Sequence, residues 1–106
     1  MSNRFMRVLI FFDLPTYTAK DMKDYRQFRK FLIKNGFIMV QESIYSKLVI
    51  NRNSLSLVKK KVKDNLPPCG NIQLLEVTEK QFASIEYLRG KSQNKIIDSE
   101  DRVVEL

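Results

Sequence analysis

The chain has 106 residues, with 19 lysines and arginines against 12 aspartates and glutamates, giving a net charge of +7. This length suits one domain rather than two, and the positive charge favours a polyanionic partner such as nucleic acid over mere solubility. The absence of histidine excludes a histidine general base and histidine metal ligands, and the single cysteine, Cys69, excludes an internal disulfide. No apolar run is long enough to cross a membrane and no secretory signal is present, so we expect a cytoplasmic protein.

The first predicted element is a strand over residues 5–13. It contains the unbroken apolar run from Val8 to Phe12, ends in Asp13, and is followed by a turn signal around Pro15. Apolar residues at both parities indicate a central strand that is covered on both faces. Asp13 has two interpretations: it caps the turn at Pro15, or its carboxylate carries chemistry.

A helix is predicted over about residues 19–35. Thr18 opens it with Asp21 three residues later, which is a capping-box spacing, and Gly36 suits a left-handed C-terminal cap. Helical spacing puts Tyr25, Phe28 and Leu32 on one apolar face. The opposite face carries a basic stripe, which is either a solvated surface or a phosphate-binding surface. Its residues are Lys23, Arg26, Lys30 and Lys34.

The next segment, residues 37–50, is rich in β-formers and predicts two short strands with a tight turn or bulge at residues 41–43. Asn53 or Ser54 then caps a second helix. The apolar stripe of this helix is Leu55, Val58, Val62 and Leu66, and its lysines lie to the sides and outside as Lys59, Lys60, Lys61 and Lys63. Leu57 falls on the outer side, either as a stray surface leucine or as part of a partner contact.

Residues 71–78 predict a fourth strand. The order βαββαβ is that of an α+β, ferredoxin-like fold, with a four-stranded antiparallel sheet, two helices on one face and the first strand in a central position. After it we expect one helical turn over residues 79–83 and a short strand over 84–88. We place the core at residues 1–90 and assign 91–106 to a polar linker and a C-terminal strand.

The second face of this sheet needs a cover, because the first strand is apolar on both sides and few residues remain to cover it. The simplest cover is a second copy of the chain, in a symmetric homodimer. The β-prone end of the chain is either a frayed tail or a strand that docks on the sheet edge of another protomer or protein. Its residues are Arg102, Val103, Val104 and Leu106.

Five segments share a pattern with one known family. In chain order they are Phe11-Phe12-Asp13-Leu14-Pro15, Arg29-Lys30-Phe31-Leu32 running into Asn35-Gly36-Phe37, Gln41-Glu42-Ser43-Ile44-Tyr45, Val77-Thr78-Glu79-Lys80-Gln81-Phe82, and Asp101-Arg102-Val103-Val104. Over nearly the whole chain they resemble the CRISPR-associated protein 2 family, and the last segment resembles its type II form.

This resemblance implies a homodimer that assembles with the CRISPR integrase, CRISPR-associated protein 1, and acquires new spacers for antiviral defence. It also implies that the chain is a Mg²⁺-dependent endonuclease for single-stranded RNA or double-stranded DNA, as many members are described to be. The family's metal-binding aspartate maps onto Asp13. Many members have a tyrosine just before it, where this chain has Phe12, so any role for that hydroxyl is absent.

A metal site without histidine must use oxygen ligands, which suits Mg²⁺ or Mn²⁺. One Asp13 per chain is too few ligands for a metal site made of protein alone, but a dimer brings two such carboxylates together. A cation between them would relieve their mutual repulsion. Three functions therefore stand in order. The first is a DNA-binding scaffold for the integrase, and the second is a nuclease with paired Asp13. The third, an RNA-binding domain, ranks last because no RNP-type motif is present.

Overall fold

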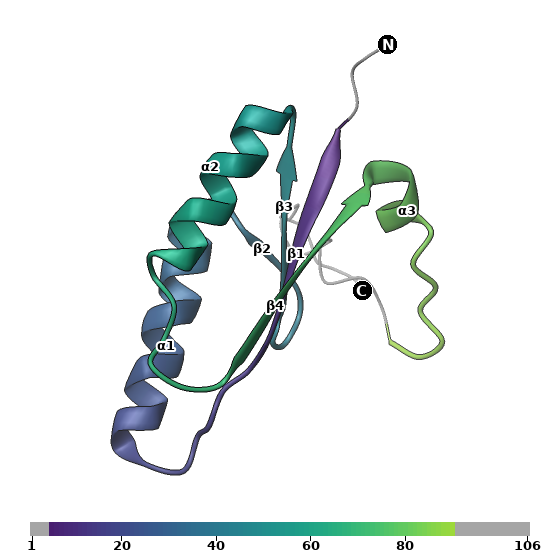
Figure 1. Ribbon diagram of the computed structural model, residues 1–106. Helices are drawn as coiled ribbons and strands as arrows, with labels where there is room; N and C mark the ends of the chain where they lie inside the picture. The colour runs from purple at the N-terminus through teal and green to yellow at the C-terminus, as the bar shows by residue number, and fades with distance from the viewer. Residues whose placement is uncertain (1–4, 91–106) are drawn as a thin grey trace.

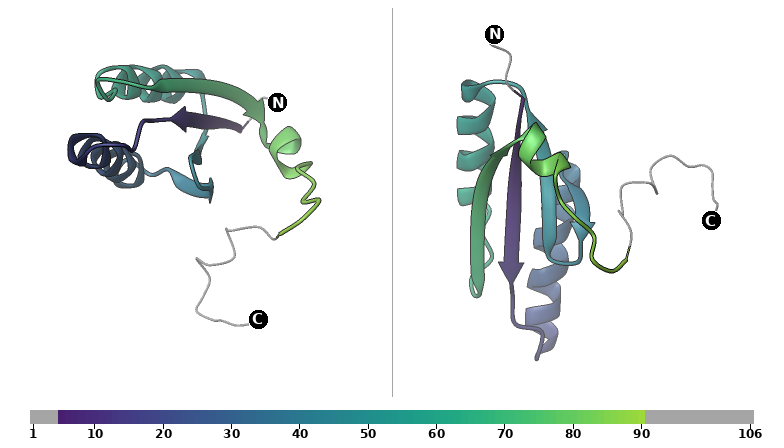
Figure 2. Two further views of the ribbon diagram at one scale, coloured as in Figure 1. Left: turned by 90° about the horizontal axis from the view of Figure 1, so that it is seen from below. Right: turned by 90° about the vertical axis from the view of Figure 1, so that its right-hand side faces the viewer.

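A computed structural model describes residues 5–90. These residues form a four-stranded antiparallel sheet in the order β2-β3-β1-β4 (Figure 1). The elements are β1 (Met6–Asp13), α1 (Ala19–Lys34), β2 (Ile38–Gln41), β3 (Ile44–Val49), α2 (Arg52–Lys63), β4 (Asn71–Thr78) and α3 (Glu79–Ala83). The helices α1 and α2 cover one face of the sheet, and α3 lies on the other side (Figure 2). The predicted ferredoxin-like fold is confirmed, while the predicted C-terminal strand lies outside the described residues.

β1 is central, as predicted, because it pairs with β3 on one side and β4 on the other. Val8, Ile10 and Phe12 point to the helices and are buried, as expected for alternate residues of a pleated strand. Leu9, which points to the other face, is also buried. The second face of β1 is therefore already partly covered within the chain.

The core beneath α1 is aromatic. The ring of Phe12 lies 5.4 Å from that of Phe28, 5.7 Å from that of Tyr45 and 5.9 Å from that of Tyr25. Aromatic contacts of this kind add about 0.5–1.5 kcal/mol to the free energy gained by burial. Leu32, one turn beyond Phe28, is fully buried, which confirms the predicted apolar stripe of α1.

The ends of α1 follow the sequence signals. The backbone N–H of Asp21 donates to Thr18 Oγ1 (3.0 Å), and the Thr18 N–H donates to Asp21 Oδ2 (3.1 Å), which completes the capping box. Gly36 adopts a φ of +89°, in the left-handed region that favours glycine. A Cβ at that position would meet only the end of the flexible Lys47 side chain, which can move aside, so the backbone conformation is what favours glycine.

The turn predicted at residues 41–43 is confirmed. Glu42 and Ser43 connect β2 to β3, and Ser43 has a φ of +71°. The pairing register shifts between Met39 and Gln41, which is the irregularity of a β-bulge.

The second helix differs from expectation at both ends. Asn51 is its N-cap and accepts a hydrogen bond from the Ser54 N–H (2.8 Å). The prediction that Asn53 or Ser54 caps the helix is therefore wrong, because both residues lie in its first turn. The helix ends at Lys63, and Leu66 lies beyond it with 49% of its surface exposed. Pro67 explains why Leu66 is not helical, because a residue that precedes proline is pushed out of the helical conformation.

The segment after β4 is helical and then irregular. The predicted turn over residues 79–83 is confirmed as α3, which Thr78 and Gln81 open with a second capping box. The predicted strand over 84–88 is wrong, because residues 84–90 form no strand and Leu88 is 92% exposed. A strand exists only with a pairing partner, and among residues 5–90 this segment has none.

Candidate functional site

Asp13 lies at the carboxyl end of β1, exposed to solvent. The pleat puts it on the same face as Leu9 and Phe11, away from α1 and α2. Its carboxylate takes part in no ion pair or side-chain hydrogen bond among residues 5–90, so it does not cap the turn at Pro15 in this structure. Asp13 thus offers, at the end of the central strand, a carboxylate that has no ion-pair or side-chain hydrogen-bond partner among residues 5–90.

Gly70 fixes the backbone beside Asp13. It has a φ of +98°, and a Cβ there would lie 2.8 Å from the Asp13 carbonyl oxygen and 2.5 Å from Leu14 Cδ2. No larger residue fits without a shift of the chain. Gly70 therefore lets the start of β4 approach the end of β1 closely.

The carboxylate of Asp13 suits a hard cation, but one chain offers few further ligands beside it. Among the described residues, no group of three histidine, cysteine, aspartate or glutamate side chains is placed to hold a metal ion. Mg²⁺ keeps several of its waters and needs only one or two carboxylates, so a single exposed aspartate is compatible with such a cation. Any further ligands of such a cation would have to come from neutral oxygens, water, substrate or a second chain.

Phe12 points in the opposite direction from Asp13, into the aromatic core under α1. A tyrosine hydroxyl at this position would lie on the helix side of the sheet. The missing hydroxyl therefore removes nothing from the surroundings of the Asp13 carboxylate within this chain.

The basic stripe of α1 is exposed along its length. None of its members takes part in an ion pair among residues 5–90, so the positive charges stand uncompensated there. The four residues are Lys23, Arg26, Lys30 and Lys34. We name this surface the α1 basic face.

The lysines of α2 do not form one comparable surface. Lys59 is partly buried and paired with Glu76 of β4, and Lys60 pairs with Asp64 at 2.9 Å. Lys61 and Lys63 form no ion pair with other described residues. The four lysines predicted to bind nucleic acid are therefore not equivalent. Lys59 faces the sheet, and both Lys59 and Lys60 have counter-ions.

A network of polar contacts that no sequence motif indicates lies on the sheet face opposite α1 and α2. The Arg7 guanidinium donates to both carboxylate oxygens of Glu79 (2.7 and 3.0 Å) and to Ser46 Oγ (3.4 Å), and lies 4.6 Å from the Phe82 ring centroid. These contacts hold α3 against the sheet. The hydrogen bond from Arg7 also holds the pKa of the Glu79 carboxyl below its ordinary value, against the opposing effect of burial.

The rest of this sheet face exposes apolar side chains. Leu48 of β3 and Leu75 of β4 are 41% and 48% exposed, and Ile38 of β2 lies on the same side. Figure 2 shows α3 and the segment after it on this side of the sheet. We name its uncovered part, Ile38, Leu48 and Leu75, the open apolar face.

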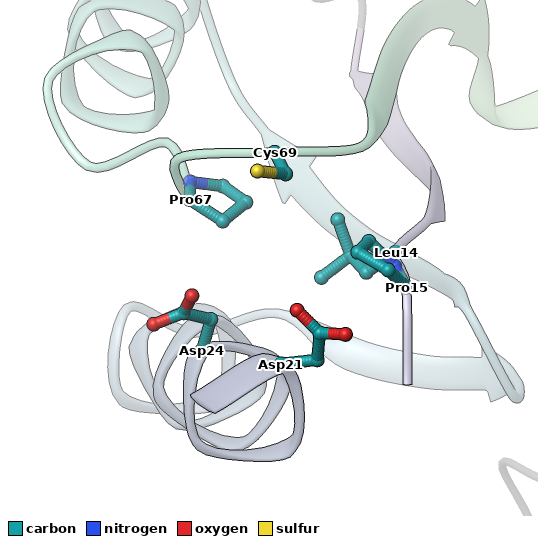
Figure 3. A pocket seen from close by; sticks show the side chains of 6 residues that line it. All are labelled: Leu14, Pro15, Asp21, Asp24, Pro67 and Cys69. Carbon is teal, nitrogen blue, oxygen red and sulfur yellow. The ribbon is translucent and has the colours of Figure 1, made fainter. Parts of the chain in front are cut away.

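A small hollow lies between the start of α1 and the loops that precede α1 and β4 (Figure 3). Both of its carboxylates already have partners, because Asp21 completes the capping box and Asp24 pairs with Lys20 at 2.9 Å. Cys69 adds an exposed thiol. Helix capping and ion pairing therefore account for both carboxylates of the hollow, and neither is left to bind a ligand.

Residues 6–85 match the family model described as CRISPR associated protein Cas2. The chain belongs to this family. It is 50% identical to a protein of Streptococcus mutans serotype c over 93% of this chain and 91% of that protein. It is 46% identical to one of Treponema denticola over 95% and 100%, and 41% identical to one of Ligilactobacillus salivarius over 93% and 98%.

Each of these three Cas2 relatives carries the name "CRISPR-associated endoribonuclease Cas2". The family resemblance in the sequence motifs is thereby confirmed. Among residues 5–90, no helix combines the length and the apolar character that spanning a bilayer requires.

Proposed function

We propose that this Cas2 family member works in the cytoplasm as a homodimer that binds duplex DNA and scaffolds the CRISPR integrase during spacer acquisition. The observation that carries the proposal is the α1 basic face, which presents four cations without counter-ions among residues 5–90. Evenly spaced cations on one helix suit a phosphate backbone and carry no sequence information, as a protein that accepts any invader fragment requires.

The open apolar face supports the dimer. Leu48 and Leu75 expose large apolar side chains on one face of a rigid sheet, and removing them from water contributes about 25 cal/mol per Å² of apolar area. A two-fold axis through this face would leave both α1 basic faces outward, on opposite sides of the dimer. Residues 102–106 are the proposed integrase dock, so their deletion should release the integrase in a pull-down and spare DNA binding.

The DNA-binding proposal is tested by salt-dependent affinity of the dimer for duplexes of different sequence. Lys30→Ala and Lys34→Ala should weaken binding to all duplexes equally. For every phosphate that is no longer neutralised, the slope of log affinity against log salt should become shallower by about 0.9. Lys20→Ala is the matched control, since it removes the same charge from the same helix but at a lysine already paired with Asp24. Equal effects of Lys20 and Lys30 would overturn the proposal, as would a sequence-dependent loss of affinity.

A second candidate is a metal-dependent endoribonuclease that uses Asp13. The names of the relatives support it, as does the uncommitted Asp13 carboxylate on the same side of the sheet as the open apolar face. Two-fold symmetry would bring two Asp13 side chains toward one site. Asp13 would hold a Mg²⁺ or Mn²⁺ ion in place, and such a cation would supply an activated water and stabilise charge at phosphorus.

Cleavage of single-stranded RNA and duplex DNA with Mg²⁺ tests this second candidate. Asp13→Ala should abolish cleavage and leave duplex binding unchanged, because Asp13 is not part of the α1 basic face. Asp64→Ala, another exposed carboxylate, is the control. If Asp13→Ala also abolishes spacer acquisition while DNA is still bound, catalysis belongs to the main function; persistent cleavage would contradict the second candidate.

A further inference from the structure

We infer that Asn71 supplies a second protein oxygen to the cation held at Asp13. This inference rests on the second candidate function and concerns a residue that the aspartate motif does not include. Asn71 is the first residue of β4, and in the β1–β4 ladder it stands directly opposite Asp13. Two residues far apart in sequence are thereby brought to one end of the sheet.

The ladder dictates where the two side chains point. Directly opposite residues of an antiparallel pair project from the same face, with their Cβ atoms about 4.5–5.5 Å apart. Asp13 lies on the face opposite α1 and α2, so Asn71 lies there too. A carboxylate and an amide at this separation are within reach of one cation between them.

Both side chains are available. Asp13 and Asn71 are exposed, and neither side chain takes part in an ion pair or a side-chain hydrogen bond among residues 5–90. The amide oxygen of asparagine is a neutral donor of the kind that Mg²⁺ and Mn²⁺ accept beside a carboxylate. It adds a ligand without adding the repulsion that a further carboxylate would bring.

The backbone around this pair is rigidly placed. Gly70, immediately before Asn71, fits against the Asp13 carbonyl oxygen and Leu14 only because it has no Cβ. The approach of the two strand ends is thus fixed before any cation binds. Ligands held in place in advance lose less conformational entropy on binding, which favours the site.

Gln73 provides a natural comparison. It lies two residues further along β4 on the same face, is exposed, and carries the same amide group, but it stands opposite Phe11. Its amide is therefore displaced from Asp13 by one repeat of the strand. If amide chemistry alone mattered, Gln73 would serve as well as Asn71; if the ladder position matters, only Asn71 will.

The test is Mn²⁺ binding to the full-length chain, followed through the electron paramagnetic resonance signal of free Mn²⁺. Asn71→Ala should weaken the Asp13-dependent binding at least tenfold, because even partners outside the ligand shell commonly contribute about 10–100-fold. Asn71→Asp should bind at least as tightly as the natural chain, and Gln73→Ala should be unchanged. Circular dichroism of each variant checks that the sheet is intact.

The outcomes separate the two proposals. If Asp13→Ala abolishes Mn²⁺ binding but Asn71→Ala does not change it, the inference is overturned and the Asp13 site stands. If Gln73→Ala weakens binding as much as Asn71→Ala, the ladder position is irrelevant and the inference is likewise overturned. If Asp13→Ala leaves Mn²⁺ binding unchanged, the inference falls together with the metal-dependent nuclease.

Discussion

Single residues decide how the end of β1 is built. Asp13 follows from a buried strand that ends in a carboxylate, and its candidacy could be predicted from sequence alone. Asn71 could not, because its relation to Asp13 exists only through the register of β1 against β4. A strand pattern gives the parity of each residue but not the residue opposite, and a shift of one position would have placed Asn71 on the other face.

Gly70→Ala should destabilise the protein by about 1–3 kcal/mol, because it adds both backbone strain and a collision with Asp13 and Leu14. Urea denaturation measures this decrease in the free energy of unfolding. Gly90→Ala is the matched control, since Gly90 has a similar φ of +91° but nothing within 4 Å of the added Cβ. Equal effects at the two glycines would show that only backbone strain matters and that the close approach of β4 to β1 contributes nothing.

Glu79 makes the free energy of unfolding depend on pH. Its pKa is lowered in the folded chain by Arg7, so the stability it contributes is present above the unfolded pKa of about 4.3 and is lost as pH falls through the folded value. Glu79→Gln should therefore lower Tm at pH 7, and the difference should disappear at the acid end of the range. The side chain is 41% exposed, so the contribution at pH 7 is under about 1 kcal/mol.

Thermal unfolding of both proteins from neutral to strongly acidic pH checks this expectation. The other carboxylates titrate alike in the two chains, so the difference in Tm isolates Glu79. A difference that stays constant over this range would contradict the role of the ionised carboxylate.

At the scale of elements, the sequence predicted best where the signal is local. The capping box of α1 and the two-residue turn of the β2–β3 hairpin depend on neighbours in the chain, and both are confirmed. The predicted cap of α2 is wrong because Asn51, Asn53 and Ser54 are all residue types that cap helices well, and the local sequence does not choose among them. The strand over 84–88 was wrong because strand propensity says nothing about whether a partner strand is present.

Asn51→Ala should cost about 0.5–2 kcal/mol in the free energy of unfolding, since it removes the acceptor of the Ser54 N–H. Asn53→Ala changes the same residue type two positions later, inside the helix, and should be neutral or slightly stabilising because alanine favours helix. Chemical denaturation of the two variants compares them directly. A larger decrease at Asn53 would mean that the helix begins there after all.

The whole molecule is asymmetric across its sheet, with charge on the helix side and apolar surface on the other. The sequence predicts a homodimer because β1 is apolar on both faces. In the structure, the exposed apolar residues that support a dimer lie on the neighbouring strands β3 and β4 instead. Leu9 is buried within the chain, whereas Leu48 and Leu75 are not. Composition could indicate an uncovered face, but only the arrangement of α3 shows which part of it the other residues of the range 5–90 leave exposed.

Leu75→Asp should convert the proposed dimer to a monomer, because it places a charge in the open apolar face. Leu57→Asp is the control: Leu57 is more exposed, at 67% against 48%, but belongs to α2 on the other side of the sheet. Sedimentation velocity gives the mass of each variant. If Leu57→Asp dissociates the dimer and Leu75→Asp does not, the interface lies on the helix side instead.

The two edges of the sheet are unequal. On one side β2 has only four residues and is bent by a bulge, while on the other β4 has eight residues, and within residues 5–90 no strand pairs with its outer edge. An unpaired edge presents N–H and C=O groups to which another strand can add, and short or bulged edge strands resist such pairing. The short, bulged edge of β2 is therefore poorly suited to pairing, and a further strand would add more readily along the long, regular edge of β4.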